Sequence, residues 1–88
     1  MSFRVVVTRT AARQLAEKLP EFAAAACIEF VFGPLAENPH RVGRALRAPF
    51  LGQWRARRGV YRVRYRIDDT EQVVYVLDID HRRDAYRP

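Results

Sequence analysis

The segment from Trp54 to Arg66, WRARRGVYRVRYR, limits the possible folds of this sequence more than any other. Apolar or aromatic residues alternate with arginines on both sides of Gly59, and such period-two alternation is typical of half-buried strands. We therefore expect two antiparallel strands joined by a tight turn at Arg58-Gly59. One face of this hairpin should pack inward, and the other should carry arginines about 6.6 Å apart along each strand.

The arginine-rich face is a candidate anion site, because a guanidinium group binds phosphate through paired hydrogen bonds. Arg55, Arg57 and Arg62 lie on paired strands and can point to the same side. Arg64 and Arg66 extend that row. The alternative for these last two is an ordinary ion pair with acidic residues of the next strand or turn.

Length and charge agree with a small binding domain. The 88 residues suffice for one domain with a small core. The formal net charge is +6, and Lys18 is the only lysine, so fifteen of the sixteen basic residues are arginine. A basic patch on a small domain predicts an acidic partner, either nucleic acid or an acidic protein segment.

Several classes of protein conflict with this composition. No apolar run reaches the roughly 18 residues of a membrane helix, and the N-terminal apolar stretch is too short for a signal peptide. Cys27 is the only cysteine, so we expect a cytoplasmic protein with neither a disulfide nor a membrane contact. Cys27 and two distant histidines offer no metal-ligand spacing. Ser2 is the only serine, which excludes a serine-histidine-aspartate hydrolase, and we expect no cofactor.

Hydrophobic patterns before the hairpin predict one strand and two helices. Phe3–Val7, FRVVV, is typical of a short buried strand. Helical spacing of apolar residues predicts a helix over Arg9–Leu19 and a second, almost wholly apolar helix over Glu21–Phe32. Gly33-Pro34 should break or kink the second helix. His40–Phe50, with three arginines, is expected to be a loop that crosses to the sheet.

A last strand is expected over Gln72–Asp80, QVVYVLDID. Strict alternation would put Tyr75, Leu77 and Ile79 on one face and the residues between them on the other. The predicted order is therefore β-α-α-β-β-β, an α+β fold that forms one small domain over residues 1–88. The last three strands should form an antiparallel sheet with both helices on one face.

The predicted last strand is followed by His81, Arg82 and Tyr86. These three side chains can reach the arginine-rich face from the end of that strand. They add a group that titrates near neutrality, another phosphate clamp and an aromatic ring. A metal-independent ribonuclease needs such groups to align a 2′-hydroxyl, stabilise the developing charge and transfer protons. The alternatives are a surface histidine and a frayed terminal tyrosine. Composition and spacing alone indicate a basic α/β domain that binds phosphate.

The sequence resembles the RelE/ParE superfamily of bacterial toxins, and the RelE branch more closely. The segments that carry the resemblance span nearly the whole chain: TRTAARQLAEKLP, EFVFGPLAENPHRVGRALR, WRARRGVYRVRYRIDD and VLDIDHRRDAYR. The G-x-Y-R pattern at Gly59–Arg62 and the terminal HR-x-x-x-Y are specific in this combination.

The resemblance implies a toxin of a type II toxin–antitoxin pair that inhibits translation. Such toxins enter the ribosomal A site and cut mRNA without a metal, leaving a 2′,3′-cyclic phosphate. It also implies a RelB-like antitoxin that neutralises the toxin through an acidic or amphipathic segment. Operator DNA would be contacted only through the toxin–antitoxin complex.

The resemblance also implies site residues by position. The family prototype has lysines where Arg55 and Arg57 stand, and arginine does not release its proton, so we expect His81 to transfer protons. The expected catalytic residues are Arg55, Arg57, Arg62, His81, Arg82 and Tyr86. The expected RNA-binding residues are Arg55, Arg57, Arg58, Arg62, Arg64, Arg82 and Arg83.

Two other functions compete with the ribonuclease. A ParE-like inhibitor of DNA gyrase would bind a protein and need no nuclease residues. A degenerate toxin would bind its antitoxin and regulate, and would be harmless when expressed alone. The basic and aromatic set near the hairpin favours the ribonuclease.

Overall fold

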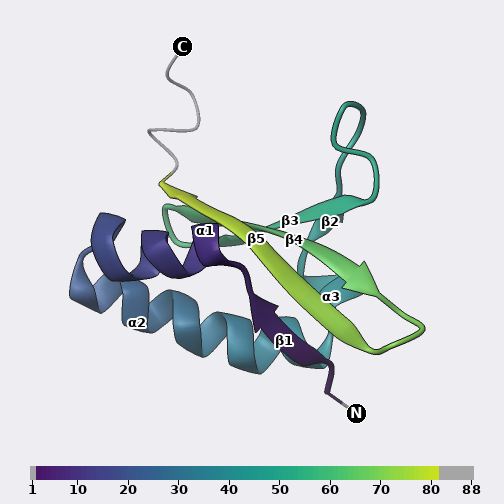
Figure 1. Cartoon of the computed structure of the whole chain (residues 1–88), viewed down its shortest axis with the longest axis horizontal. Helices are drawn as coiled ribbons and strands as arrows, with labels where there is room; N and C mark the ends of the chain where they lie inside the picture. The colour runs from purple at the N-terminus through teal and green to yellow at the C-terminus, as the bar shows by residue number, and fades with distance from the viewer. Residues whose placement is uncertain (1, 82–88) are drawn as a thin grey trace.

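The computed structural model describes residues 2–81, which form a five-stranded sheet with helices packed on one face (Figure 1). The strands are β1 (Arg4–Val7), β2 (Arg44–Ala45), β3 (Gln53–Arg58), β4 (Tyr61–Asp68) and β5 (Val73–His81). Their order across the sheet is β1-β5-β4-β3-β2. Only β1 runs parallel to its neighbour, at the edge beside β5. The predicted α+β fold is confirmed.

The helical layer consists of two main helices, each continued by a π-helical turn. The helical elements are α1 (Arg9–Arg13), η1 (Gln14–Lys18), α2 (Glu21–Phe30), η2 (Val31–Leu35) and the short α3 (Pro39–Val42). The Thr8 hydroxyl caps α1 by accepting from the Ala11 amide. Pro34 lies inside η2. The helix therefore continues through Gly33-Pro34. Proline has no backbone N–H to donate, and the wider π-helical turn at this point changes the hydrogen-bonding pattern around it.

Two predicted boundaries near the hairpin were wrong. The segment expected to be a plain loop contains α3 and β2, and β2 extends the sheet by pairing Arg44 with Arg55. The hairpin turn is Gly59-Val60, one residue later than predicted, because β3 runs through Arg58. Gly59 has a φ of +63°, and glycine at the first position of a two-residue turn suits a primed hairpin turn.

A β-bulge in β5 changes which residues face the core. Arg64 pairs with Asp78 but the next residue, Tyr65, pairs with Val76, so Leu77 has no partner on β4. The predicted strict alternation of β5 was therefore wrong. Residues before and after the bulge reach the core together, and Val76 and Ile79 are both buried there.

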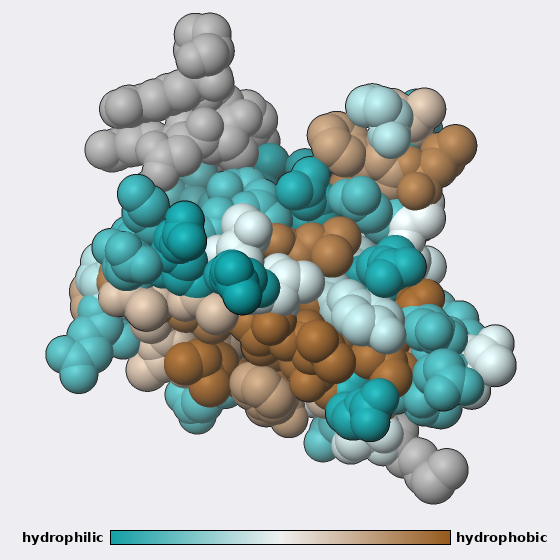
Figure 2. Space-filling view, viewed as in Figure 1, coloured by the Kyte–Doolittle hydropathy of each residue, from teal (hydrophilic) through white to brown (hydrophobic). Residues whose placement is uncertain are grey.

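The core lies between the helices and the sheet, with the Tyr65 side chain at 0% exposure near its centre. The Tyr65 hydroxyl donates a hydrogen bond to the Pro39 carbonyl oxygen. Figure 2 shows apolar surface over the helical layer and β1, with a separate apolar cluster on the β2–β3 loop. Within residues 2–81, no helix is long and apolar enough to cross a membrane.

Burial of Tyr65 predicts a loss of stability at high pH. Burial raises its pKa to about 12, whereas an unfolded tyrosine ionises near 10. The unfolded state therefore loses its proton first, so stability is intact below about pH 10 and falls by about 2–3 kcal/mol as pH rises to about 12. Urea titrations across this pH range measure the loss.

The matched control for this prediction is Tyr65→Phe, which keeps the ring and cannot ionise. It should be less stable at neutral pH by about 1 kcal/mol, the value of a lost hydrogen bond. Its alkaline loss should be smaller than that of the wild type. Equal alkaline losses in the two proteins would contradict the assignment to Tyr65.

Candidate functional site

The face of the sheet opposite the helices carries arginines from three adjacent strands. Arg57 lies directly opposite Arg62, and Arg55 lies opposite Arg64 on one side and Arg44 on the other. Opposed residues of an antiparallel pair project from the same face, and like charges in such positions destabilise a sheet. The predicted convergence of Arg55, Arg57, Arg62 and Arg64 is therefore present in the structure.

Arg62 is the only buried charged side chain among residues 2–81, with 7% exposure. Burying a guanidinium group is costly unless it is paired. Asp80 lies directly opposite Arg62 on β5, so the central arginine has a carboxylate on one flank and Arg57 on the other.

A cleft of about 240 Å³ opens on this face, lined by Leu46, Phe50, Arg55, Arg62, Arg64 and Asp80. Phe50 comes from the β2–β3 loop and is 43% exposed. The guanidinium carbon of Arg64 lies 5.3 Å from the centre of the Phe50 ring. The cleft therefore joins a basic floor to an aromatic wall, a combination suited to a nucleotide.

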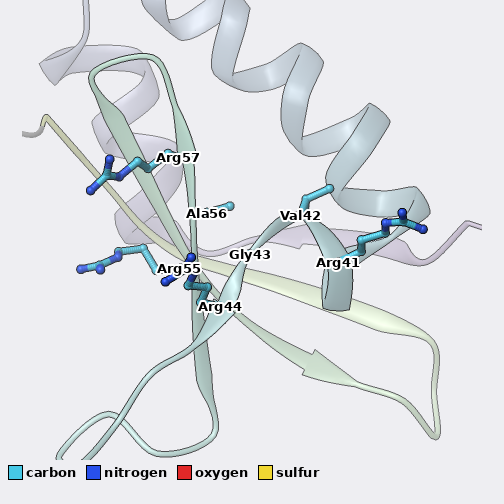
Figure 3. Close-up of a pocket in the computed structure, with 7 residues that line it drawn as sticks. All are labelled: Arg41, Val42, Gly43, Arg44, Arg55, Ala56 and Arg57. Carbon is cyan, nitrogen blue, oxygen red and sulfur yellow. The ribbon is translucent and has the colours of Figure 1, made fainter.

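A second groove, of about 410 Å³, borders the first at Arg55. It runs past Gly43 between the start of β2 and β3, and Figure 3 shows the residues that line it. Arg55 and Arg57 point to one side of β3, whereas Ala56 points to the other and Arg41 points away from them. The open face thus continues from the cleft to the edge of the sheet.

The expected alternative, an ion pair with an acidic residue of the next strand, holds for Arg64, whereas Arg66 contacts an aromatic ring. Arg64 Nη2 lies 3.4 Å from Asp78 Oδ2, and the Arg66 guanidinium lies 4.8 Å from the centre of the Tyr75 ring. Arg64 still keeps a buried Nε with no hydrogen-bond acceptor among the described residues. The guanidinium group has five N–H donors and the Arg64 side chain is 33% exposed, so Arg64 can hold its ion pair and donate through another N–H to an anion in the cleft.

Gln14 fixes the β5 segment beside the cleft. Its Nε2 donates to Asp78 Oδ1, and its Oε1 accepts from the Ile79 amide at 2.7 Å. The residue that follows this clamped pair is Asp80. Gln14 of η1 therefore anchors β5 at the two residues that precede Asp80.

Two predicted site residues, Arg58 and His81, lie on the opposite side of the sheet. Both are paired with Tyr61, and the His81 ring meets the Tyr61 ring edge-to-face at 5.2 Å. Arg58 is close enough to α2 to influence the Cys27 thiol. Burial raises the pKa of this thiol, and the positive charge of Arg58 partly offsets the rise. The expectation that His81 reaches the arginine face was wrong, because Asp80 takes the open-face position beside it.

The predicted residues Arg82, Arg83 and Tyr86 lie outside the described residues. Within residues 2–81, no three histidine, cysteine, aspartate or glutamate side chains gather as metal ligands do.

Sequence reasoning missed two groups in the cleft, Phe50 and Asp80. Asp80 was treated only as an ion-pair partner, and its cross-strand position opposite Arg62 was the available signal. Phe50 lies in a segment rich in glycine and proline, which carries no periodic pattern. No sequence signal pointed to its contact with Arg64.

Comparison with known proteins gives a consistent family. The family model described as "ParE toxin of type II toxin-antitoxin system, parDE" matches residues 5–86. Toxin RelE of Mycobacterium tuberculosis is 53% identical over 85 residues, which cover 97% of this chain and 87% of that protein. Toxin RelG of the same organism is 49% identical over 87 residues, 99% of each protein.

Solved structures agree with these relatives. The toxin–antitoxin complex RelBE2 of Mycobacterium tuberculosis contains a chain that matches with a TM-score of 0.89 and 48% identity, over 93% of this chain and 100% of that one. A free-state arginine-to-alanine mutant of Escherichia coli RelE matches with a TM-score of 0.73 and 19% identity, over 98% and 88% of the two chains, which supports the fold alone. The chain belongs to the RelE/ParE superfamily of type II toxin–antitoxin toxins and is RelE-like within it.

Proposed function

We propose that this toxin is a ribosome-dependent endoribonuclease that cuts mRNA in the ribosomal A site without a metal ion. The observation that carries the proposal is the set of opposed arginines around a cleft that contains buried Arg62. Like charges held directly opposite one another disfavour folding. A bound phosphate would offset this repulsion. Because the opposed arginines lower the stability of the free fold, their presence supports a binding role for this face.

In the proposed reaction, the 2′-hydroxyl attacks the adjacent phosphorus and the 5′-oxygen leaves. Arg62 and Arg55, which both line the cleft, would hold the phosphate and stabilise the pentavalent state. Arg57 would hold the neighbouring RNA backbone. We retain Arg82 and Tyr86 as proposed contributors on the strength of the family resemblance. Arginine suits the electrostatic role, because its charge is permanent and its donors are planar.

Phe50 is proposed to stack on an RNA base beside the scissile phosphate. Replacing Phe50 with alanine should weaken binding of ribosome-bound mRNA by about 5- to 150-fold, since stacking contributes about 1–3 kcal/mol per base. The control is Leu51→Ala, because Leu51 is the next loop residue, is 75% exposed and does not line the cleft. The apparent affinity in cleavage assays measures both. Equal effects of the two changes would argue against stacking.

The proposed inhibitory partner is a RelB-like antitoxin, acting in the cytoplasm. Its acidic residues would pair with the arginine face, so this part of the binding should weaken with salt. Its apolar residues have exposed partners on the helical layer, Phe22, Ile28 and Phe32. Operator DNA would be bound through the complex of the two proteins.

The direct test uses purified ribosomes programmed with a short mRNA. The proposal is supported if cleavage requires the ribosome. Cleavage should also continue after a chelator removes free metal ions while the magnesium that holds the ribosome together is kept. The second candidate, inhibition of DNA gyrase, is favoured by the ParE description of the matching family model. Inhibited supercoiling by gyrase, with intact mRNA, would support that candidate.

A further inference from the structure

The proposed cleavage needs a group that accepts the proton of the 2′-hydroxyl. The arginines on the open face do not serve, because a guanidinium group stays protonated in proteins. His81 projects toward Tyr61 on the helical side of the sheet. The inference below rests on the proposed function and concerns the identity of this proton acceptor.

Asp80 has the position that such an acceptor requires. It lies opposite Arg62 on the neighbouring strand, and it lines the cleft together with Arg55 and Arg64. Of the described residues that line this cleft, Asp80 alone carries a carboxylate. A phosphate held by Arg62 would therefore place its 2′-hydroxyl neighbour near this carboxylate.

We propose that Asp80 is the general base of the reaction. Its carboxylate takes the proton of the 2′-hydroxyl as the 2′-oxygen bonds to phosphorus. The bond from phosphorus to the 5′-oxygen then breaks, and the leaving 5′-oxygen takes a proton from water. The products are a 2′,3′-cyclic phosphate and a free 5′-hydroxyl, and Asp80 returns its proton to solvent.

Basic side chains lie near Asp80 on both sides of the sheet. Arg55, Arg62 and Arg64 face it across the cleft. Lys18 and His81 border a hollow of about 450 Å³ on the helical side that Asp80 also lines. The phosphate of a bound RNA would offset part of this positive charge.

The test is single-turnover cleavage of ribosome-bound mRNA by Asp80→Asn between about pH 5 and 8. The variant keeps the size of the side chain and cannot act as a base. We expect its rate to fall at least about 100-fold, and we expect it to lose the wild-type decline in rate toward acid pH. Asp80→Glu, which keeps a carboxylate, should retain that acid decline. Glu71→Gln makes the same charge change on the exposed β4–β5 turn and should behave as wild type.

A substrate with sulfur in place of the 5′-oxygen distinguishes a general base from a general acid. Its thiolate leaving group needs no proton, so only the loss of a general base still slows its cleavage. The defect of Asp80→Asn should persist on this substrate, and its disappearance would overturn the proposal. Asp80→Asn cleaving within about threefold of wild type, with the same pH profile, would also overturn it while leaving the ribonuclease function intact. A wild-type protein that cuts no ribosome-bound mRNA would overturn both.

Discussion

Replacing Arg62 with alanine is expected to slow mRNA cleavage by about 10²- to 10³-fold, the cost of removing one charge-stabilising donor from an active site. Arg62 is the buried arginine at the centre of the open face, and it lines the cleft. Its charge would act where the negative charge of the pentavalent phosphate develops. Single-turnover cleavage on programmed ribosomes measures the effect.

The control for Arg62→Ala is Arg13→Ala, which removes an equal charge from α1, far along the chain from the open face. Arg13 is exposed, and its ion pair among residues 2–81 is a 3.8 Å contact with Glu17, so cleavage should hardly change. Arg62→Lys keeps the positive charge but lacks the planar guanidinium group, so its cleavage rate should lie between those of Arg62→Ala and Arg13→Ala. Thermal unfolding of each variant reports whether the fold is retained. Similar rates for Arg62→Ala and Arg13→Ala would contradict the assigned role.

Replacing Gly43 with alanine is expected to destabilise the fold by about 1–3 kcal/mol or more, the usual cost of overpacking a core. An added Cβ would clash with the Tyr65 hydroxyl oxygen and would lie 2.8 Å from the Arg55 carbonyl oxygen. The φ of Gly43 is −131°, so the requirement for glycine is one of space and not of backbone conformation. Urea denaturation measures the loss.

Gly33→Ala is the matched control for Gly43→Ala. No atom lies within 4 Å of an added Cβ at Gly33, and the residue lies within η2, so alanine should stabilise by about 0.5–1 kcal/mol. Tyr65→Phe removes the nearer clashing atom and should recover part of the loss in the double variant with Gly43→Ala. Gly43→Ala with wild-type stability would contradict this packing.

Local sequence patterns predicted most of the fold. The alternation from Trp54 to Arg66 and the helical spacing before it are set by neighbours in the chain, so they can be seen without the structure. The bulge at Leu77 could not be predicted, because it depends on how β5 aligns with β4. Strict alternation fails at such a point, and the faces of all later residues change with it.

The same register decided how much of the site could be predicted. Arg55, Arg57 and Arg62 converge as expected, since a short hairpin fixes their alignment. His81 does not join them, and Asp80 does, because the face of each residue at the end of β5 follows from the bulge. Long-range contacts of irregular segments, such as the loop that carries Phe50, leave no periodic signal in a sequence.

The most direct test of the central claim is primer-extension mapping of mRNA ends after this chain is expressed alone in cells, beside Arg62→Ala. The account predicts cuts inside translated codons, dependent on ribosomes, that disappear or nearly disappear with Arg62→Ala. Growth arrest by the wild type without such cuts would contradict the ribonuclease and favour gyrase. Neither arrest nor cuts would indicate a degenerate toxin that only binds its antitoxin.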